Sequence, residues 1–175
     1  MTMSSGDVVD VLDRLDGVQI GVWLDGGWGV DALLNSQTRP HDDLDLIVRI
    51  SDVPALREVL ARDGFELVEG AWDSSFVLSD PRGREIDVHT VRFDREGNGI
   101  NTGVPGGGNE LAMYPASGFS GTGTVAGREV MCFTPELQML CHSGGYEPGE
   151  TDFHDVRLLH DRFGTPLPTR FAGLV

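Results

Sequence analysis

The feature that most constrains the fold is a strand–glycine–helix junction near the start of the chain. A short apolar run at 20–24 is followed by Gly26 and Gly27, and an apolar segment at 28–34 comes directly after them. This order predicts a buried strand, a tight turn and a helix whose first N–H groups face the turn. Glycine allows a ligand to approach the backbone there because no Cβ blocks the way. The junction therefore predicts a place where a helix N-terminus can meet a phosphate.

A second feature places carboxylates on predicted strands. Apolar and other residues alternate over 43–50, so Asp43 and Asp45 are expected on one face of a strand. Two carboxylates roughly 7 Å apart along a strand can share a pair of Mg²⁺ ions, which prefer oxygen ligands. Asp87 lies inside another apolar strand, at 84–91, where a buried unpaired carboxylate is costly. If the strands are neighbours, the crowded charges require a cation, and Asp87 is the natural general base for an attacking alcohol.

The remaining elements follow from hydrophobic spacing and turn signals. We expect helices at 5–16, 52–62, 135–142 and 152–163, strands at 65–68 and 75–79, and a hairpin at 124–132. The stretch 95–123 is rich in Gly, Asn and Pro, and its length predicts a binding loop or lid. The whole chain, 1–175, is expected to be one domain with a mixed sheet, of α/β or α+β class. Its catalytic sheet and helices span about 20–133, and a helical pair spans about 134–165.

Charge and composition restrict the partners. The chain has 28 acidic and 13 basic residues, a formal net charge of −15, which repels a nucleic-acid backbone and attracts cationic small molecules or divalent metals. We therefore expect no nucleic-acid partner. The sequence has no apolar run long enough to span a bilayer and no signal peptide at 1–10, so we expect no membrane partner and a cytoplasmic protein. Cys132 and Cys141 are expected to be thiols, with a disulfide as the alternative.

These motifs resemble those of a known superfamily. The segments WLDGGWGVDAL at 23–33 and TRPHDDLD at 38–45, together with Asp87, resemble the glycine pair, double acid and third acid of polymerase-β-like nucleotidyltransferases. Within that superfamily the chain looks like the small antibiotic nucleotidyltransferases, namely the lincosamide enzymes and the aminoglycoside 2″-enzymes. Further matches to the lincosamide branch lie at 93–99, 114–116, 121–124 and 146–148, so the resemblance covers about 20–165.

The resemblance implies an α+β fold with an α/β-like start, in which helices flank a mixed twisted sheet and a short helical segment ends the chain. It also implies Mg²⁺-dependent transfer of AMP from ATP to a hydroxyl of a small-molecule antibiotic, with release of pyrophosphate. A lincosamide is the first acceptor to expect and an aminoglycoside the second. In this reading Asp43, Asp45 and Asp87 hold two Mg²⁺ ions and Asp87 is the base. Gly27 meets the triphosphate, with Gly26 and Trp28 beside it.

Other residues are candidates with open alternatives. Arg39 and His41 stand where a cation can contact the phosphates, although Arg39 can instead brace the strand at 42–45. Four residues are candidates for binding the acceptor, and each can instead have a purely structural role: Glu85, His89, His142 and Tyr146. The segment 142–146 is one residue longer than the His-x-Gly-Tyr expected of the lincosamide branch, which leaves the acceptor open. The rival functions are transfer to a protein or RNA acceptor and an inactive nucleotide-binding protein. A monomer and a homodimer are both compatible with the sequence.

Overall fold

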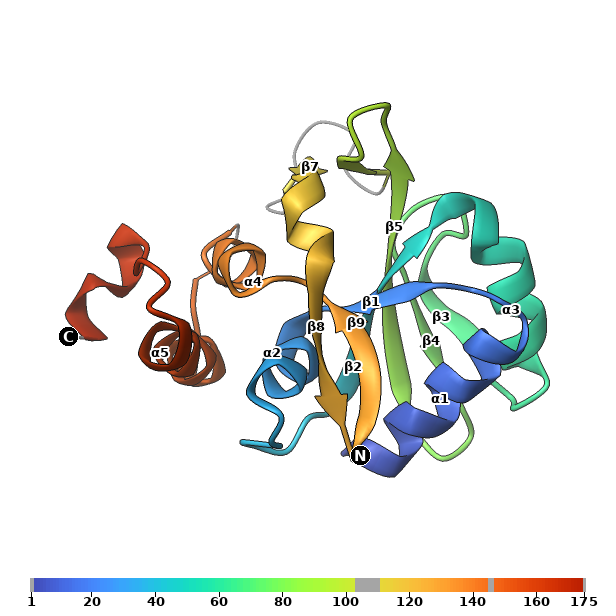
Figure 1. Ribbon diagram of the computed structural model, residues 1–175. Helices are drawn as coiled ribbons and strands as arrows, with labels where there is room; N and C mark the ends of the chain where they lie inside the picture. The colour runs from blue at the N-terminus through green and yellow to red at the C-terminus, as the bar shows by residue number, and fades with distance from the viewer. Residues whose placement is uncertain (1, 103–110, 145–146, 175) are drawn as a thin grey trace.

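A computed structural model describes residues 2–102, 111–144 and 147–174 and shows an α+β fold built around one mixed, twisted sheet (Figure 1). Nine strands are present in these residues, in the spatial order β3-β4-β5-β2-β1-β9-β8, with β6 paired to β5 and β7 paired to β6. The strands are β1 (Val22–Leu24), β2 (Asp43–Arg49), β3 (Glu66–Gly70), β4 (Phe76–Ser79), β5 (Glu85–Phe93), β6 (Gly99–Asn101), β7 (Met113–Tyr114), β8 (Gly121–Val125) and β9 (Arg128–Cys132). The expected mixed sheet is confirmed.

The centre of the sheet is formed by β2, which runs antiparallel to β1 on one side and parallel to β5 on the other. The side chains of Leu44, Leu46 and Val48 enter the main hydrophobic core, whereas Ile47 belongs to a second, smaller core on the opposite face. This alternation is the one expected from the sequence. It leaves Asp43 and Asp45 on the side of the sheet that the main core does not fill.

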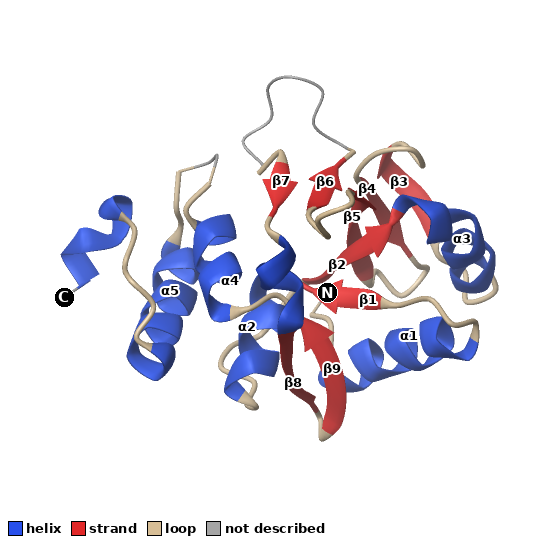
Figure 2. Ribbon diagram, turned by 45° about the horizontal axis from the view of Figure 1, so that its top comes forward, coloured by secondary structure: helices blue, strands red, loops and turns tan. Residues whose placement is uncertain are grey.

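The helices are α1 (Ser5–Gly17), α2 (Gly26–Leu34), α3 (Val53–Ala61), α4 (Pro135–His142) and α5 (Glu150–Phe163), with short 3-10 helices at Ile50–Asp52, Ala116–Ser120 and Thr169–Leu174. Two views show α1 and α3 together on one side of the molecule, and α4 and α5 beyond α2 on the other (Figures 1 and 2). The helix α1 starts with a capping box formed by Ser4 and Asp7. No helix in the described part of the chain has the length and apolar character needed to cross a membrane.

Most expected elements occur within one or two residues of their predicted bounds. The helix α2 begins at Gly26 itself rather than at residue 28, and α5 begins at Glu150 rather than at 152. The turn after β4 carries Gly83 at φ +76°, a left-handed conformation that glycine adopts without strain. Cys132 is buried and Cys141 is partly buried, and both are thiols, as expected. Burial raises the pKa of Cys132 to about 12.

The prediction of one continuous loop at 95–123 was wrong for much of that stretch. It contains β6 and β7, the 3-10 helix Ala116–Ser120 and the first half of β8. Several glycines there make room for close packing: a Cβ on Gly99 would lie 2.6 Å from Cζ of Phe119. From the sequence alone, the same glycines are interpreted as part of a binding loop or lid. Residues 103–110, with Gly106-Gly107-Gly108, lie outside the described residues, so the binding-loop role stays a prediction.

The packing of α2 against β8 generates a stability prediction. A Cβ on Gly123 would lie 2.0 Å from the carbonyl oxygen of Ala32, which is backbone and cannot rotate away. We expect Gly123→Ala to lower the free energy of unfolding by about 1–3 kcal/mol, because the helix must shift from the hairpin. The control is Gly17→Ala, since a Cβ there meets nothing within 4 Å. Urea unfolding of both variants measures the difference, and equal stabilities would contradict the close α2–β8 contact.

Candidate active site

The parallel pairing of β2 with β5 brings acidic residues from two strands together. Its register sets Asp45 opposite Asp87, and Asp43 opposite Glu85. One ligand atom each of Asp45, Asp87 and His89 lies within 4.8 Å of the others, a spacing that can hold a metal ion. Nε2 of His89 is 3.7 Å from Oδ2 of Asp87. Of the three aspartates expected to meet at one place on the sheet, Asp45 and Asp87 lie in this group together with His89, whereas Asp43 does not.

The crowding of carboxylates changes the acidity of Asp45. Burial, followed by the charges of Asp43, Asp25 and Asp87, raises the pKa of Asp45 from its ordinary value of 3.8 to about 8, while His89 acts in the opposite direction. Asp43 is exposed but close enough to contribute to this effect. An ionised Asp45 is therefore unfavourable unless a cation compensates the negative charge. Oxygen donors from two aspartates fit a hard divalent metal.

The predicted glycine turn lies directly against this cluster. Asp25 is the N-cap of α2 and accepts a hydrogen bond from the Gly26 backbone N–H at 2.8 Å. Gly26 has φ +55°, and a Cβ there would lie 2.0 Å from Oδ2 of Asp45. The positive end of the α2 dipole is thus beside the carboxylates of β2. A negatively charged group bound at the metal cluster would also meet the start of this helix.

Arg39 and His41 pack on the same turn, each held by an aspartate. A Cβ on Gly27 would lie 2.3 Å from Nδ1 of His41 and 2.6 Å from Nη2 of Arg39. Arg39 donates to both carboxylate oxygens of Asp155 on α5, at 3.0 and 2.7 Å. His41 is buried, with Nε2 2.5 Å from Oδ2 of Asp31 on α2. The pair Arg39–Asp155 shows that Arg39 joins the last helix to the turn.

The other candidates are distributed around the site. Trp28 is 2% exposed and lies in the main core with its ring 4.6 Å from that of His41. Glu85 is exposed at the start of β5. His142 is buried at the end of α4, and its Nδ1 is 3.0 Å from Oδ1 of Asp152. Tyr146 lies outside the described residues.

Sequence reasoning missed several supporting aspartates. Asp25 caps α2, and its charge raises the pKa of Asp45. Asp31 pairs with His41, and Asp155 pairs with Arg39. Asp25 is a favoured N-cap residue type, but the predicted helix began at residue 28, so the signal became clear only when α2 proved to begin at Gly26. Asp31 and Asp155 had none, since each lies within a helix and its partner is 10 or 116 positions away in the chain.

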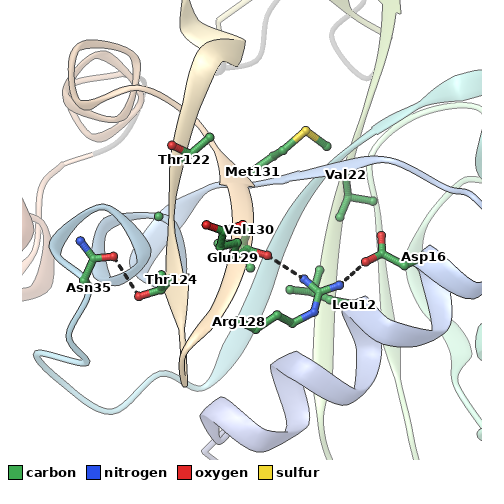
Figure 3. A pocket seen from close by; sticks show the side chains of 11 residues that line it. Leu12, Asp16, Val22, Asn35, Thr122, Thr124, Arg128, Glu129, Val130 and Met131 are labelled. Carbon is green, nitrogen blue, oxygen red and sulfur yellow. Dashed lines mark hydrogen bonds and ion pairs between the residues drawn. The ribbon is translucent and has the colours of Figure 1, made fainter.

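A separate hollow of about 600 Å³ lies beside the β8–β9 hairpin and α1, and none of the site carboxylates lines it (Figure 3). Arg128 crosses it to pair with Asp13 and Asp16 at the end of α1. Thr124 donates a hydrogen bond to Asn35 at its other side, at 2.8 Å. These contacts tie the hairpin to α1 and α2.

The α+β fold, the glycine turn at a helix N-terminus and the neighbouring carboxylates together define a nucleotidyltransferase. The model of the aminoglycoside-2″-adenylyltransferase family matches residues 7–159, and the chain belongs to this family of antibiotic nucleotidyltransferases. A lincosamide resistance protein from Staphylococcus haemolyticus is 31% identical over 149 residues, which cover 85% of this chain and 89% of the relative.

Solved structures agree with this assignment. The lincosamide antibiotic adenylyltransferase LnuA, in a lincomycin-bound crystal structure, is 28% identical, with a TM-score of 0.78 over 91% of this chain and 98% of LnuA. The aminoglycoside enzyme ANT(2″)-Ia, in complex with adenylyl-2″-tobramycin, has a TM-score of 0.67 at 20% identity, over 90% of this chain and 87% of its own. The second likeness bears on the fold alone. The family resemblance and the fold class expected from the sequence are confirmed.

The raised pKa of Asp45 predicts how the metal-free protein responds to pH. Between pH 3.8 and about 8 the folded state holds a proton on Asp45 that the unfolded chain has released. Raising the pH through this range therefore favours unfolding. We expect the Tm in EDTA to fall by roughly 5 °C from pH 5 to pH 8.5. Added Mg²⁺ should restore it at the higher pH.

The matched variant is Asp45→Asn, which cannot ionise. Its Tm in EDTA should stay nearly level over the same pH range and should respond less to Mg²⁺ than that of the native protein. Thermal unfolding followed by circular dichroism measures both curves. The same pH dependence in the native protein and in Asp45→Asn would refute the predicted acidity of this carboxyl.

Proposed function

We propose that this protein transfers AMP from ATP to a hydroxyl group of a small-molecule antibiotic and releases pyrophosphate. The observation that carries the proposal is the β2–β5 register, which sets Asp45 opposite Asp87 beside the N-terminus of α2. A nucleotide needs a cation for its phosphates and donors for its oxygens, and both can be supplied here. Membership of an adenylyltransferase family supports the same reaction.

Different residues of the chain have separate roles in this reaction. Asp87 accepts the proton of the acceptor hydroxyl as general base, and the hydroxyl oxygen attacks the α-phosphorus. The bond between the α- and β-phosphates breaks and pyrophosphate leaves. Nε2 of His89 lies 3.7 Å from the Asp87 carboxylate and helps to orient it. The amide of Gly27, with Gly26 beside it, faces the triphosphate at the start of α2.

Asp43, Asp45 and Asp87 would hold two Mg²⁺ ions, which stabilise charge on the triphosphate and lower the pKa of the attacking hydroxyl when bound. The crowding that raises the pKa of Asp45 to about 8 supports a cation at this place. Arg39 and His41 flank the turn, and Arg39 is the one with a partly exposed side chain, 22%. We assign Arg39 to the phosphates and His41 to shaping the turn.

The acceptor is proposed to be a lincosamide. Two similarities support this choice: the 31% identity to a lincosamide resistance protein and the likeness to lincomycin-bound LnuA. An aminoglycoside is the second candidate, because the matching family model is that of aminoglycoside-2″-adenylyltransferases. Both drug classes are cationic, which suits a chain with a net charge of −15. Glu85 and His89 lie on the strand that carries the base and are assigned to the acceptor side.

Incubation with ATP, Mg²⁺ and either lincomycin or tobramycin tests the proposal. We expect lincomycin to gain the mass of one adenylyl group and pyrophosphate to appear in equal amount, as measured by mass spectrometry and a coupled assay. Replacement of Mg²⁺ by EDTA should abolish the reaction. If no lincosamide or aminoglycoside in a broad panel gains a nucleotide, the proposed function is wrong.

The Asp87→Asn substitution tests the base. Because Asp87 is placed both as general base and as one of three metal ligands, its substitution should lower kcat by about 100-fold or more. Asp42→Asn is the matched control, because Asp42 is an exposed aspartate next to the site and its loss should change kcat by less than about twofold. Comparable kcat values for Asp87→Asn and the native protein would remove Asp87 from this role.

A further inference from the structure

One buried histidine nitrogen near the glycine turn lacks a hydrogen-bond partner among the described residues. His142 ends α4 and is 8% exposed. Its Nδ1 faces the Asp152 carboxylate at 3.0 Å, and its Nε2 is the atom without a partner. Because an ionised carboxylate can only accept a hydrogen bond, Nδ1 carries the hydrogen of that bond, and Nε2 is the ring nitrogen that remains without a partner. A buried polar atom without a partner is costly, which points to a ligand that supplies one.

The position of α4 shows where this nitrogen lies. Gln138 is one helical turn before His142, on the same face of α4. Its Nε2 is 3.4 Å from the carbonyl oxygen of Leu24, and a Cβ on Gly29 would lie 2.0 Å from it. This face of α4 is therefore packed on the first turn of α2. His142 continues this face of α4, and it is close enough to Asp25, the N-cap of α2, for the charge of that residue to raise its pKa.

The charges around His142 indicate that it is a donor. Burial alone lowers the pKa of His142, but the hydrogen bond to Asp152 and the charges of Asp155 and Asp25 raise it above its ordinary value. A protonated imidazole carries a hydrogen on Nε2 as well as on Nδ1. The partner of Nε2 is then a hydrogen-bond acceptor, and an anionic oxygen suits it best.

Arg39 supplies a cation at the glycine turn. Arg39 is bound to Asp155, and its guanidinium is in contact with Gly27. Asp155 raises the pKa of both Arg39 and His142, so one carboxylate of α5 lies near both side chains. Two cationic donors beside a helix N-terminus match a polyphosphate.

We propose that His142 donates a hydrogen bond from Nε2 to the β- or γ-phosphate of the bound nucleotide, with Asp152 as the residue that positions it. This inference rests on the proposed function and moves His142 from the acceptor side to the nucleotide side. The contact is made to the part of the nucleotide that leaves as pyrophosphate. AMP has no such phosphate and does not reach His142.

Titration calorimetry of the full chain with Mg²⁺ and either α,β-methylene-ATP or AMP tests the proposal. His142→Asn keeps a nitrogen near the Nδ1 position, facing Asp152, and removes Nε2. We expect it to weaken binding of the ATP analogue by about 10- to 100-fold, the loss of a hydrogen bond to a charged group, and to leave AMP binding within about threefold. In turnover, KM for ATP should rise while KM for the drug stays level.

Two further variants complete the test. His160→Asn is the control, because His160 on α5 bonds the Thr165 carbonyl at 2.8 Å and the substitution should leave nucleotide binding unchanged. His142→Gln places a nitrogen near Nε2 and should bind the ATP analogue more tightly than His142→Asn does. It also serves if the asparagine variant does not fold.

The possible failures are distinguishable. If the native protein binds no Mg²⁺-nucleotide, the proposed function fails. If the native protein binds the ATP analogue and the folded His142 variants bind it equally well, the inference about His142 is overturned and the proposed function stands. Equal losses for the ATP analogue and AMP would also overturn it, because they would place His142 away from the outer phosphates.

Discussion

The parallel pairing of β2 with β5 is the interaction on which the site depends. A slip of one residue would turn every side chain of β2 to the other face and separate Asp45 from Asp87. Leu44 and Leu46 oppose this slip because both are fully buried in the main core. The free energy of burying the apolar face therefore offsets the cost of holding like charges together on the other. A metal or substrate that relieves the repulsion would be bound by a scaffold already in place.

The last helix extends this scaffold to the glycine turn. From α5, Asp155 binds Arg39 and Asp152 binds His142, so two buried carboxylates hold an arginine and a histidine in place. Arg39 and Asp155 are 116 positions apart, whereas His142 and Asp152 lie on consecutive helices. Both pairs are largely removed from water, where breaking an ion pair or a charged hydrogen bond is expensive. The short helical segment at the end of the chain thus has a direct effect on the geometry at the start of α2.

Much of the site was predictable because its signals are local. The alternation over β2, the strand–glycine–helix junction at 20–34 and the carboxylate within β5 each occupy one short continuous segment, within the reach of periodicity arguments. The glycines between 95 and 123 show where such arguments fail. Some glycines are needed because they permit a turn. Gly99 and Gly123 are needed because a Cβ would collide with a neighbouring element, and composition alone does not distinguish the two cases. The pairing of β6 with β5 carries no side-chain signature either, since backbone groups make it.

The sequence by itself determined most of the elements outside 95–123, the face of β2 that carries Asp43 and Asp45, and the family, because the signals for each lie in residues near one another in the chain. Only the tertiary structure decided which of these residues act together. It set Asp87 across from Asp45, added His89 and Asp25 to the charges around them, and tied Arg39 to Asp155 rather than to the adjacent strand. These contacts join residues up to 116 positions apart, and their geometry follows from packing of the whole chain.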